Sequence, residues 1–191
     1  MATVVVSVNV KPLQDTMARL SRKVESRAYL ETLGLRILAW VDENFRAGGL
    51  EHPWVPLSPN TIASRRQGSG AGSAQPLRDT GRMAQSFVYE LDPGGRSVWV
   101  GTRDEKAQWH QEGTRPYIIR PVRAKMLRFI TASPQGPKSK RGGGGFFAFA
   151  KEVHHPGIPA RPLLPTPGLA RDLAVEVMEG FVQELRDESK R

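Results

Sequence analysis

The chain has 191 residues, no cysteine and a formal net charge of +9. The length predicts a single domain over residues 1–191, and the lack of cysteine excludes disulfide frameworks, thiol nucleophiles and zinc–thiolate sites. No apolar stretch reaches the roughly 20 residues that a membrane-spanning helix needs.

The N-terminal third predicts a strand followed by a long helix. Residues 1–10 are rich in valine and predict a strand, so residues 1–12 form a possible N-terminal appendage. Apolar residues then recur at helical spacing from Leu13 to Phe45. The stripe changes phase near residues 26–29, so either one kinked helix or two helices fit it. Gly48 and Gly49 end the helix.

Short helices and flexible loops are predicted next. Ser58 and Pro59 are typical of a helix start, here a helix over residues 59–66. Residues 67–75 and 133–145 are rich in Gly with Ser, Pro or Lys, and predict flexible loops. Asp79 and Thr80 can cap a short helix over residues 81–87, and residues 104–111 predict one or two helical turns.

Strands and a final helix complete the prediction. Residues 87–91 and 97–100 flank an Asp-Pro-Gly-Gly turn and predict a hairpin. Residues 117–121 and 126–130 predict another strand pair, and residues 146–153 a third strand of that group. In residues 169–187 every fourth residue is apolar, which predicts an amphipathic helix. The fold class is therefore α+β, an antiparallel sheet packed by a long N-terminal and a C-terminal amphipathic helix, with short helices and mobile Gly-rich loops.

The residues that could carry chemistry do not converge on a reaction. His154 and His155 are adjacent, so on an extended segment they point to opposite sides and rarely bind one metal ion. Ser86, His110 and Asp79 could form a triad, but the sequence has no Gly-x-Ser-x-Gly nucleophile elbow. The glycine run at residues 142–145 lacks the ending of a phosphate-binding loop. We expect no enzymatic activity, no cofactor and no metal.

Positive charge is concentrated in the centre of the chain. Residues 96–141 contain 11 Lys/Arg and three acids, a net charge of 11 − 3 = +8. Such a region either is a solvated face or attracts phosphate or an acidic partner. Within it, Lys138, Lys140 and Arg141 form a possible basic loop that faces DNA or a partner.

Six short patterns occur in a fixed order along the chain. They are Trp54-Val-Pro-Leu-Ser58 with Thr61 and Arg65; Leu77, Thr80, Gly81, Met83 and Ser86; Val100-Gly101; Ala107, His110, Gln111 and Gly113; Pro121, Ala124, Leu127 and Phe129; and Pro159-Ala-Arg-Pro-Leu-Leu164. Over residues 40–186 this order resembles the phage virion morphogenesis or tail-completion family of the Mu type. The chain departs from that pattern at Trp109 and at residues 133–145.

The resemblance implies a structural virion protein of a tailed phage or prophage, needed for tail completion or head–tail joining. It implies a ring of identical copies, other neck or tail proteins as partners, possible non-specific contact with passing DNA, and no membrane. The location is the virion, and the host cytoplasm during assembly. The alternative function is a basic nucleic-acid-binding accessory protein.

A subset of the residues in the six patterns is expected to form the family signature and to serve in assembly. These residues are Trp54, Pro56, Leu57, Leu77, Thr80, Gly81, His110, Gly113, Pro121, Arg161 and Pro162. The glycines mark turns or close backbone approaches, and Pro121 belongs at a sheet edge or bulge. Arg161 can bind a carboxylate or a carbonyl with its forked guanidinium. Arg161 and His110 are the two residues that we expect to have a role beyond that of ordinary solvent-exposed side chains.

Overall fold

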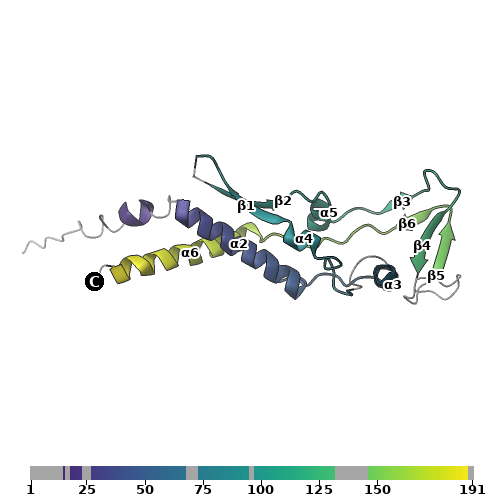
Figure 1. Cartoon of the computed structure of the whole chain (residues 1–191), viewed down its shortest axis with the longest axis horizontal. Coiled ribbons are helices and arrows are strands. Elements are labelled where there is room, and N and C mark those ends of the chain that lie inside the picture. Colours follow the sequence, from purple (N-terminus) through teal and green to yellow (C-terminus); the bar gives the residue numbers. More distant parts are fainter. Residues whose placement is uncertain are drawn as a thin grey trace, which may run out of the picture. The chain divides into compact units, whose positions relative to one another are not determined.

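The structure is a computed structural model that describes residues 15, 18–22, 27–67, 73–94, 97–131 and 146–188. Long helices lie in the N- and C-terminal parts of the described chain, with short helices and antiparallel strand pairs between them (Figure 1), which confirms the α+β class. The predicted N-terminal strand lies outside the described residues, as do residues 68–72 and 133–145 of the predicted loops. The basic loop of Lys138, Lys140 and Arg141 is therefore not described.

The helices begin and end close to their predicted positions. They are α2 (Arg27–Ala47), α3 (Pro59–Gln67), α4 (Arg82–Gln85), α5 (Lys106–Glu112) and α6 (Pro167–Glu188), and residues 18–22 are also helical. Gly48 ends α2 with a φ of 76°, and the amides of Gly48 and Gly49 both donate to the Asn44 carbonyl at 3.0 Å. At the start of α3 the Thr61 amide donates to Ser58 Oγ at 3.2 Å, as the capping prediction requires.

Strand pairing differs from the prediction in one respect. The strands are β1 (Phe87–Leu91), β2 (Val98–Thr102), β3 (Tyr117–Ile119), β4 (Leu127–Thr131), β5 (Phe146–Ala150) and β6 (Val153–His155). In the described chain they form three two-stranded sheets, β1–β2, β3–β6 and β4–β5. The predicted hairpin at β1–β2 is confirmed, but the prediction that the strands at 117–121 and 126–130 pair with each other is wrong.

The pairing error has a local cause. The single strand predicted over residues 146–153 is divided into β5 and β6, which pair antiparallel with β4 and β3. Ile119 pairs with Val153 and Leu127 with Ala150. We call β3 and β4 with their connection one arm of a ribbon, and β5 and β6 with their connection the other arm. Between the two strand pairs, residues 120–126 lie opposite only residues 151–152, so the first arm is longer. Pro121, which cannot donate to a ladder, lies in the longer arm.

The described residues fall into two compact units. Unit 1 takes the described residues within 1–38, 89–100 and 166–191, and unit 2 takes those within 39–88 and 101–165. Each unit thus draws on segments far apart in the chain, and the prediction of a single domain stays a prediction.

Unit 1 has its core between α2 and α6. Tyr29, Leu30 and Val177 are buried there, and the Phe181 ring lies 5.9 Å from the Tyr29 ring. The Tyr29 hydroxyl donates to the Ala174 carbonyl at 3.1 Å. Gly34 allows Tyr89 to approach, since a Cβ there would lie 2.8 Å from the tyrosine ring. The every-fourth-residue stripe of α6 is confirmed by the burial of Leu173, Val177 and Leu185.

Unit 2 has an aromatic core at the end of α2. Phe45 is 1% exposed, and its ring meets Trp54 edge-on at 5.4 Å and Phe87 at 5.9 Å. These spacings are typical of favourable aromatic pairs. Leu163 is also 1% exposed, so the last of the six sequence patterns, residues 159–164, contributes a side chain to the buried part of unit 2.

Candidate functional site

The closing segment, residues 158–164, is the centre of the candidate site in unit 2. The Pro162 carbonyl accepts two hydrogen bonds, from Asn44 Nδ2 at 3.0 Å and from Trp54 Nε1 at 3.3 Å. Asn44 is 1% exposed, and its Oδ1 accepts the Leu50 amide at 2.7 Å. One buried amide side chain thus joins α2, the loop after it and the closing segment. Buried polar groups need such partners because leaving them unpaired is costly.

Arg161 binds the loop that carries Trp54. Its Nε and Nη2 both donate to the Val55 carbonyl, at 3.2 and 2.8 Å, while its backbone amide donates to the His110 carbonyl at 2.6 Å. Arg161 is buried, with 5% of its surface exposed. Burial, and then the charge of Arg65, hold the pKa of Arg161 below its ordinary value. The sequence predicts that the Arg161 guanidinium binds either a carboxylate or a carbonyl, and in the structure it binds the Val55 carbonyl.

The end of α5 holds the closing segment from the other side. Gln111 Oε1 accepts the amides of Leu163 and Leu164, at 2.7 and 3.3 Å. Gly113 has a φ of 75°, and a Cβ there would lie 2.8 Å from the Ile158 carbonyl oxygen. Only glycine combines that backbone conformation with so close an approach. The prediction of a close approach at this glycine is confirmed.

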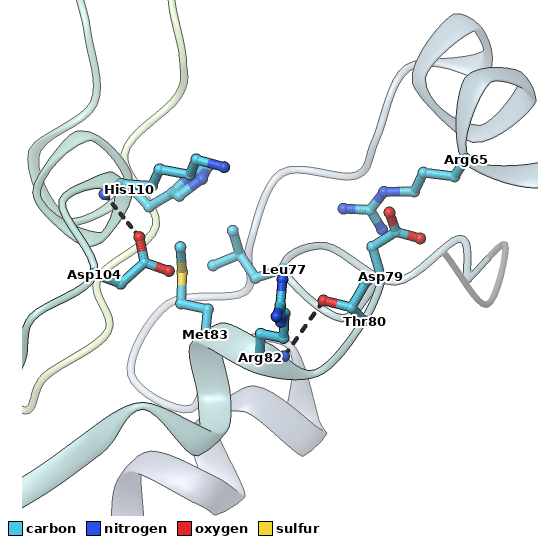
Figure 2. A pocket seen from close by; sticks show the side chains of 9 residues that line it. Arg65, Leu77, Asp79, Thr80, Arg82, Met83, Asp104 and His110 are labelled. Carbon is cyan, nitrogen blue, oxygen red and sulfur yellow. Dashed lines mark hydrogen bonds between the residues drawn. The ribbon is translucent and has the colours of Figure 1, made fainter. Parts of the chain in front are cut away.

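We call the contacts of the closing segment with Asn44, the Trp54 loop and the end of α5 the junction. Two cavities adjoin the junction and share Arg65, Leu77 and His110 in their walls. The larger, of about 430 Å³, is also lined by Asp79, Thr80, Arg82, Met83, Asp104 and Lys106. Figure 2 shows labelled side chains coming from two sides, with His110 and Asp104 from α5 and the turn before it. Arg65 comes from α3, and the remaining labelled side chains come from the segment that ends in α4. The smaller, of about 380 Å³, is lined among others by Pro56, Leu57, His155 and Arg161.

The larger cavity has charged side chains of both signs in its wall, beside Leu77 and Met83. Three cations and two carboxylates line it. Arg65 is held in place, since its Nη1 donates to the carbonyls of Ser73 and Gln75 at 3.1 and 2.8 Å. Within the described residues, Asp79 Oδ1 and His110 Nδ1 are buried without a hydrogen-bond partner. The cavity therefore offers polar groups and charges of both signs.

The triad suggested by the sequence is only partly assembled. His110 and Asp79 line the same cavity, but Ser86 Oγ lies within hydrogen-bonding distance of the Met83 carbonyl and of Thr102 Oγ1, at 2.8 and 2.6 Å. In the part of the chain that the structure describes, no three His, Asp or Glu side chains gather as a metal site would require.

His110 gives the site a pH dependence. Burial, and then the charge of Arg161, lower the pKa of His110 below its usual value. The folded protein therefore binds fewer protons here than the unfolded chain does, so folding stability rises with pH in this window. We expect the unfolding free energy to fall as pH drops below about 6.5, the unperturbed histidine value, until the lowered folded pKa is reached. Denaturant titrations at pH 7.5 and 5.5 measure this loss.

The control for this prediction is His110→Gln, which cannot titrate. This variant should lose less stability between the two pH values than the parent chain does. An equal loss in both proteins would assign the pH dependence to another group.

Most of the expected assembly residues meet in unit 2. Trp54, Gly113, Arg161 and Pro162 form the junction, while Pro56, Leu57, Leu77, Thr80 and His110 line the cavities. Gly81 lies next to them as the residue before α4, with a φ of 75°. Pro121 belongs instead to the unequal ribbon arm between β3 and β4.

Two residues of the junction were missed in the sequence. Asn44 lies three residues after Val41 on the buried side of α2, and a lone amide on an apolar stripe just before Gly48-Gly49 was the available signal. The sequence predicts a flexible loop at Gln75, yet the Gln75 Nε2 donates to the carbonyls of Phe45 and Arg46 at 3.1 and 2.8 Å. The Gly- and Ser-rich composition of residues 67–75 does not indicate this role of Gln75.

The chain matches a known protein family. Residues 8–186 match the model of the phage virion morphogenesis family. We found no match among curated proteins or among solved structures.

Proposed function

The chain belongs to the phage virion morphogenesis family, and from that premise we propose that it is a ring-forming subunit of the neck or tail end, needed for tail completion or head–tail joining. Membership makes it a structural protein of phage virion morphogenesis. The single observation that carries the proposal is the match over nearly the whole chain, 8–186. The ring, the neck position and the step in tail completion are the proposed part.

The use of the signature residues supports a structural role. Trp54, Arg161 and Gln111 bond to backbone groups of their own unit. They fix the shape of unit 2 and leave its exposed apolar residues, such as Val122, for contacts with other molecules. We propose accordingly that the protein acts by binding, without catalysis and without a cofactor.

The proposed partners are copies of the same chain and other neck or tail proteins, with non-specific contact to passing DNA. The proposed locations are the virion and, during assembly, the host cytoplasm. We propose no association with a membrane. None of the helices in the described ranges is both long and apolar enough to cross one.

A basic nucleic-acid-binding accessory protein is the second candidate. One observation favours it: residues 115–126 contain four Arg/Lys and no acid. Such a protein would bind duplex DNA with an affinity that falls steeply as salt is raised. A ring subunit would instead form multimers, or attach to tails, without nucleic acid.

Deletion and complementation test the proposed function. A phage or prophage that lacks this gene should produce heads and tails that do not mature into joined virions, seen by negative-stain electron microscopy. Complementation in trans should restore plaques, and purified virions should contain the chain. Normal virions without the gene would overturn the proposal.

A further inference from the structure

Residues 115–126 combine positive charge with exposed apolar side chains, and we name them the β3–β4 surface. The cations are Arg115, Arg120, Arg123 and Lys125. The exposed apolar residues are Tyr117, Ile118, Val122 and Met126, of which Val122 is 96% exposed. Tyr117 and Ile118 are neighbours on β3 and therefore lie on opposite faces, so Val122 is the apolar residue most available for contact, and it lies beside Arg123 and close to Lys125.

The β3–β4 surface is preorganised by the neighbouring strand. The Tyr117 ring stacks on His155 of β6, with centroids 4.8 Å apart and planes at 20°. Arg120 Nε donates to Glu152 Oε2 at 3.2 Å across the ribbon. Because residues 120–126 face only residues 151–152, the surplus residues loop outward and carry Val122 with them. A surface already ordered loses less entropy on binding.

The composition of this surface favours a protein partner over DNA. Duplex DNA would occupy the four cations through its phosphates. It would leave Tyr117, Ile118, Val122 and Met126 without an apolar partner in the phosphate backbone. A protein surface with acids around an exposed apolar residue matches both properties at once.

Helix α6 carries such a surface. Its 22 residues contain two Arg and six acids, a net charge of 2 − 6 = −4. Asp172, Val175 and Glu179 are spaced by three and four residues, so they lie on one face, and all three are exposed, Val175 by 48%. In the described ranges Asp172 and Glu179 form no ion pair, and neither do Arg123 and Lys125.

We propose that the β3–β4 surface of one copy docks on the outer face of α6 of the next copy. Arg123 and Lys125 meet Asp172 and Glu179, and Val122 packs against Val175. Two different faces of one chain then meet head to tail, which is the type of contact that every ring of identical subunits requires. The inference rests on the proposed ring function and names the surfaces that build it.

Cross-linking tests the docking directly, because the chain has no cysteine of its own. Val122→Cys combined with Val175→Cys, treated with a short bis-maleimide, should give a ladder of dimers, trimers and higher multimers. Each single variant should stay monomeric on the denaturing gel, since identical positions do not meet. The test uses both the concentrated purified chain and complemented virions. No ladder in either preparation, or dimers from a single variant, overturns the docking.

Charge reversal tests the proposed ion pairs. Arg123→Glu with Lys125→Glu should weaken self-association about tenfold or more, and Asp172→Lys with Glu179→Lys should do the same. Combining all four substitutions should restore association, because the pairs re-form with exchanged signs. Arg19→Glu with Arg22→Glu changes the charge equally on an exposed helical turn elsewhere, and should leave association unchanged. Sedimentation velocity at low and moderate salt measures each variant.

The outcomes separate this inference from the proposed function. Rings visible by electron microscopy without a 122–175 ladder overturn the docking and leave the ring standing. Absence of any multimer, in the purified chain and in virions, overturns both. Reversal at Arg123 and Lys125 that abolishes salt-dependent duplex binding but spares self-association assigns the surface to DNA and overturns the docking.

Discussion

Trp54→Ala is expected to lower the unfolding free energy by about 3–5 kcal/mol, the usual cost of removing a large buried aromatic side chain. Trp54 is 6% exposed and meets Phe45 edge-on at 5.4 Å. The substitution removes this contact, opens a cavity beside the end of α2 and takes away one of the two donors to the Pro162 carbonyl. Such a loss is a large part of the roughly 5–15 kcal/mol that stabilises a typical domain.

Urea or guanidinium unfolding followed by circular dichroism measures the effect of Trp54→Ala. Trp54→Phe is the matched control, because it keeps a packed ring and loses only the Nε1 hydrogen bond, for a cost of about 1 kcal/mol plus the change in shape. A loss below about 1 kcal/mol for the alanine variant would show that Trp54 does not anchor this junction. Complementation titre should fall in the same order as stability.

Asn44→Asp should cost about 3 kcal/mol although it changes only one atom of the side chain. Oδ1 can still accept the Leu50 amide, but the second oxygen replaces the donor that faces the Pro162 carbonyl at 3.0 Å. A buried carboxylate then lies against a carbonyl oxygen with no donor between them. The side chain is 1% exposed, so water offers little compensation.

The sign of the pH dependence identifies this cause. The new carboxyl group should have a raised pKa in the folded state, so the Asn44→Asp variant should recover stability as pH falls through that pKa. Gln108→Glu makes the same amide-to-carboxylate change at an exposed position in the first turn of α5, where a carboxylate is tolerated, and should stay within about 0.5 kcal/mol of the parent. Unfolding midpoints at pH 7.5 and 5 that move in parallel for both variants would contradict the assignment.

The sequence could predict helices and their ends because those signals are local. Gly48-Gly49 end α2, Ser58 caps α3, and the apolar stripe of α6 is buried at Leu173, Val177 and Leu185. Each depends on residues within a few positions of one another. The partners of β3 and β4 depend instead on where a distant segment divides, and periodicity within residues 146–153 does not reveal the break at residues 151–152.

The candidate site could be predicted as a set of residues but not as an arrangement. The six patterns contain Trp54, Arg161 and Pro162, which the fold brings together from positions more than 100 residues apart. Nothing in the spacing reveals that Asn44 and Trp54 both donate to the Pro162 carbonyl, or that Arg161 binds the Val55 carbonyl. These pairings depend on contacts between residues far apart in the chain, and local sequence patterns do not reveal such contacts.

The division of each unit among distant segments has a consequence during synthesis. The core of unit 1 needs Val177 of α6 beside Tyr29, and the junction of unit 2 needs Pro162 beside Asn44. A nascent chain therefore cannot complete either core until the ribosome has made most of the protein. Folding dominated by such remote contacts is slow compared with that of local helical bundles. A truncated product should carry no finished surface, so an incomplete subunit would have nothing with which to enter a growing particle.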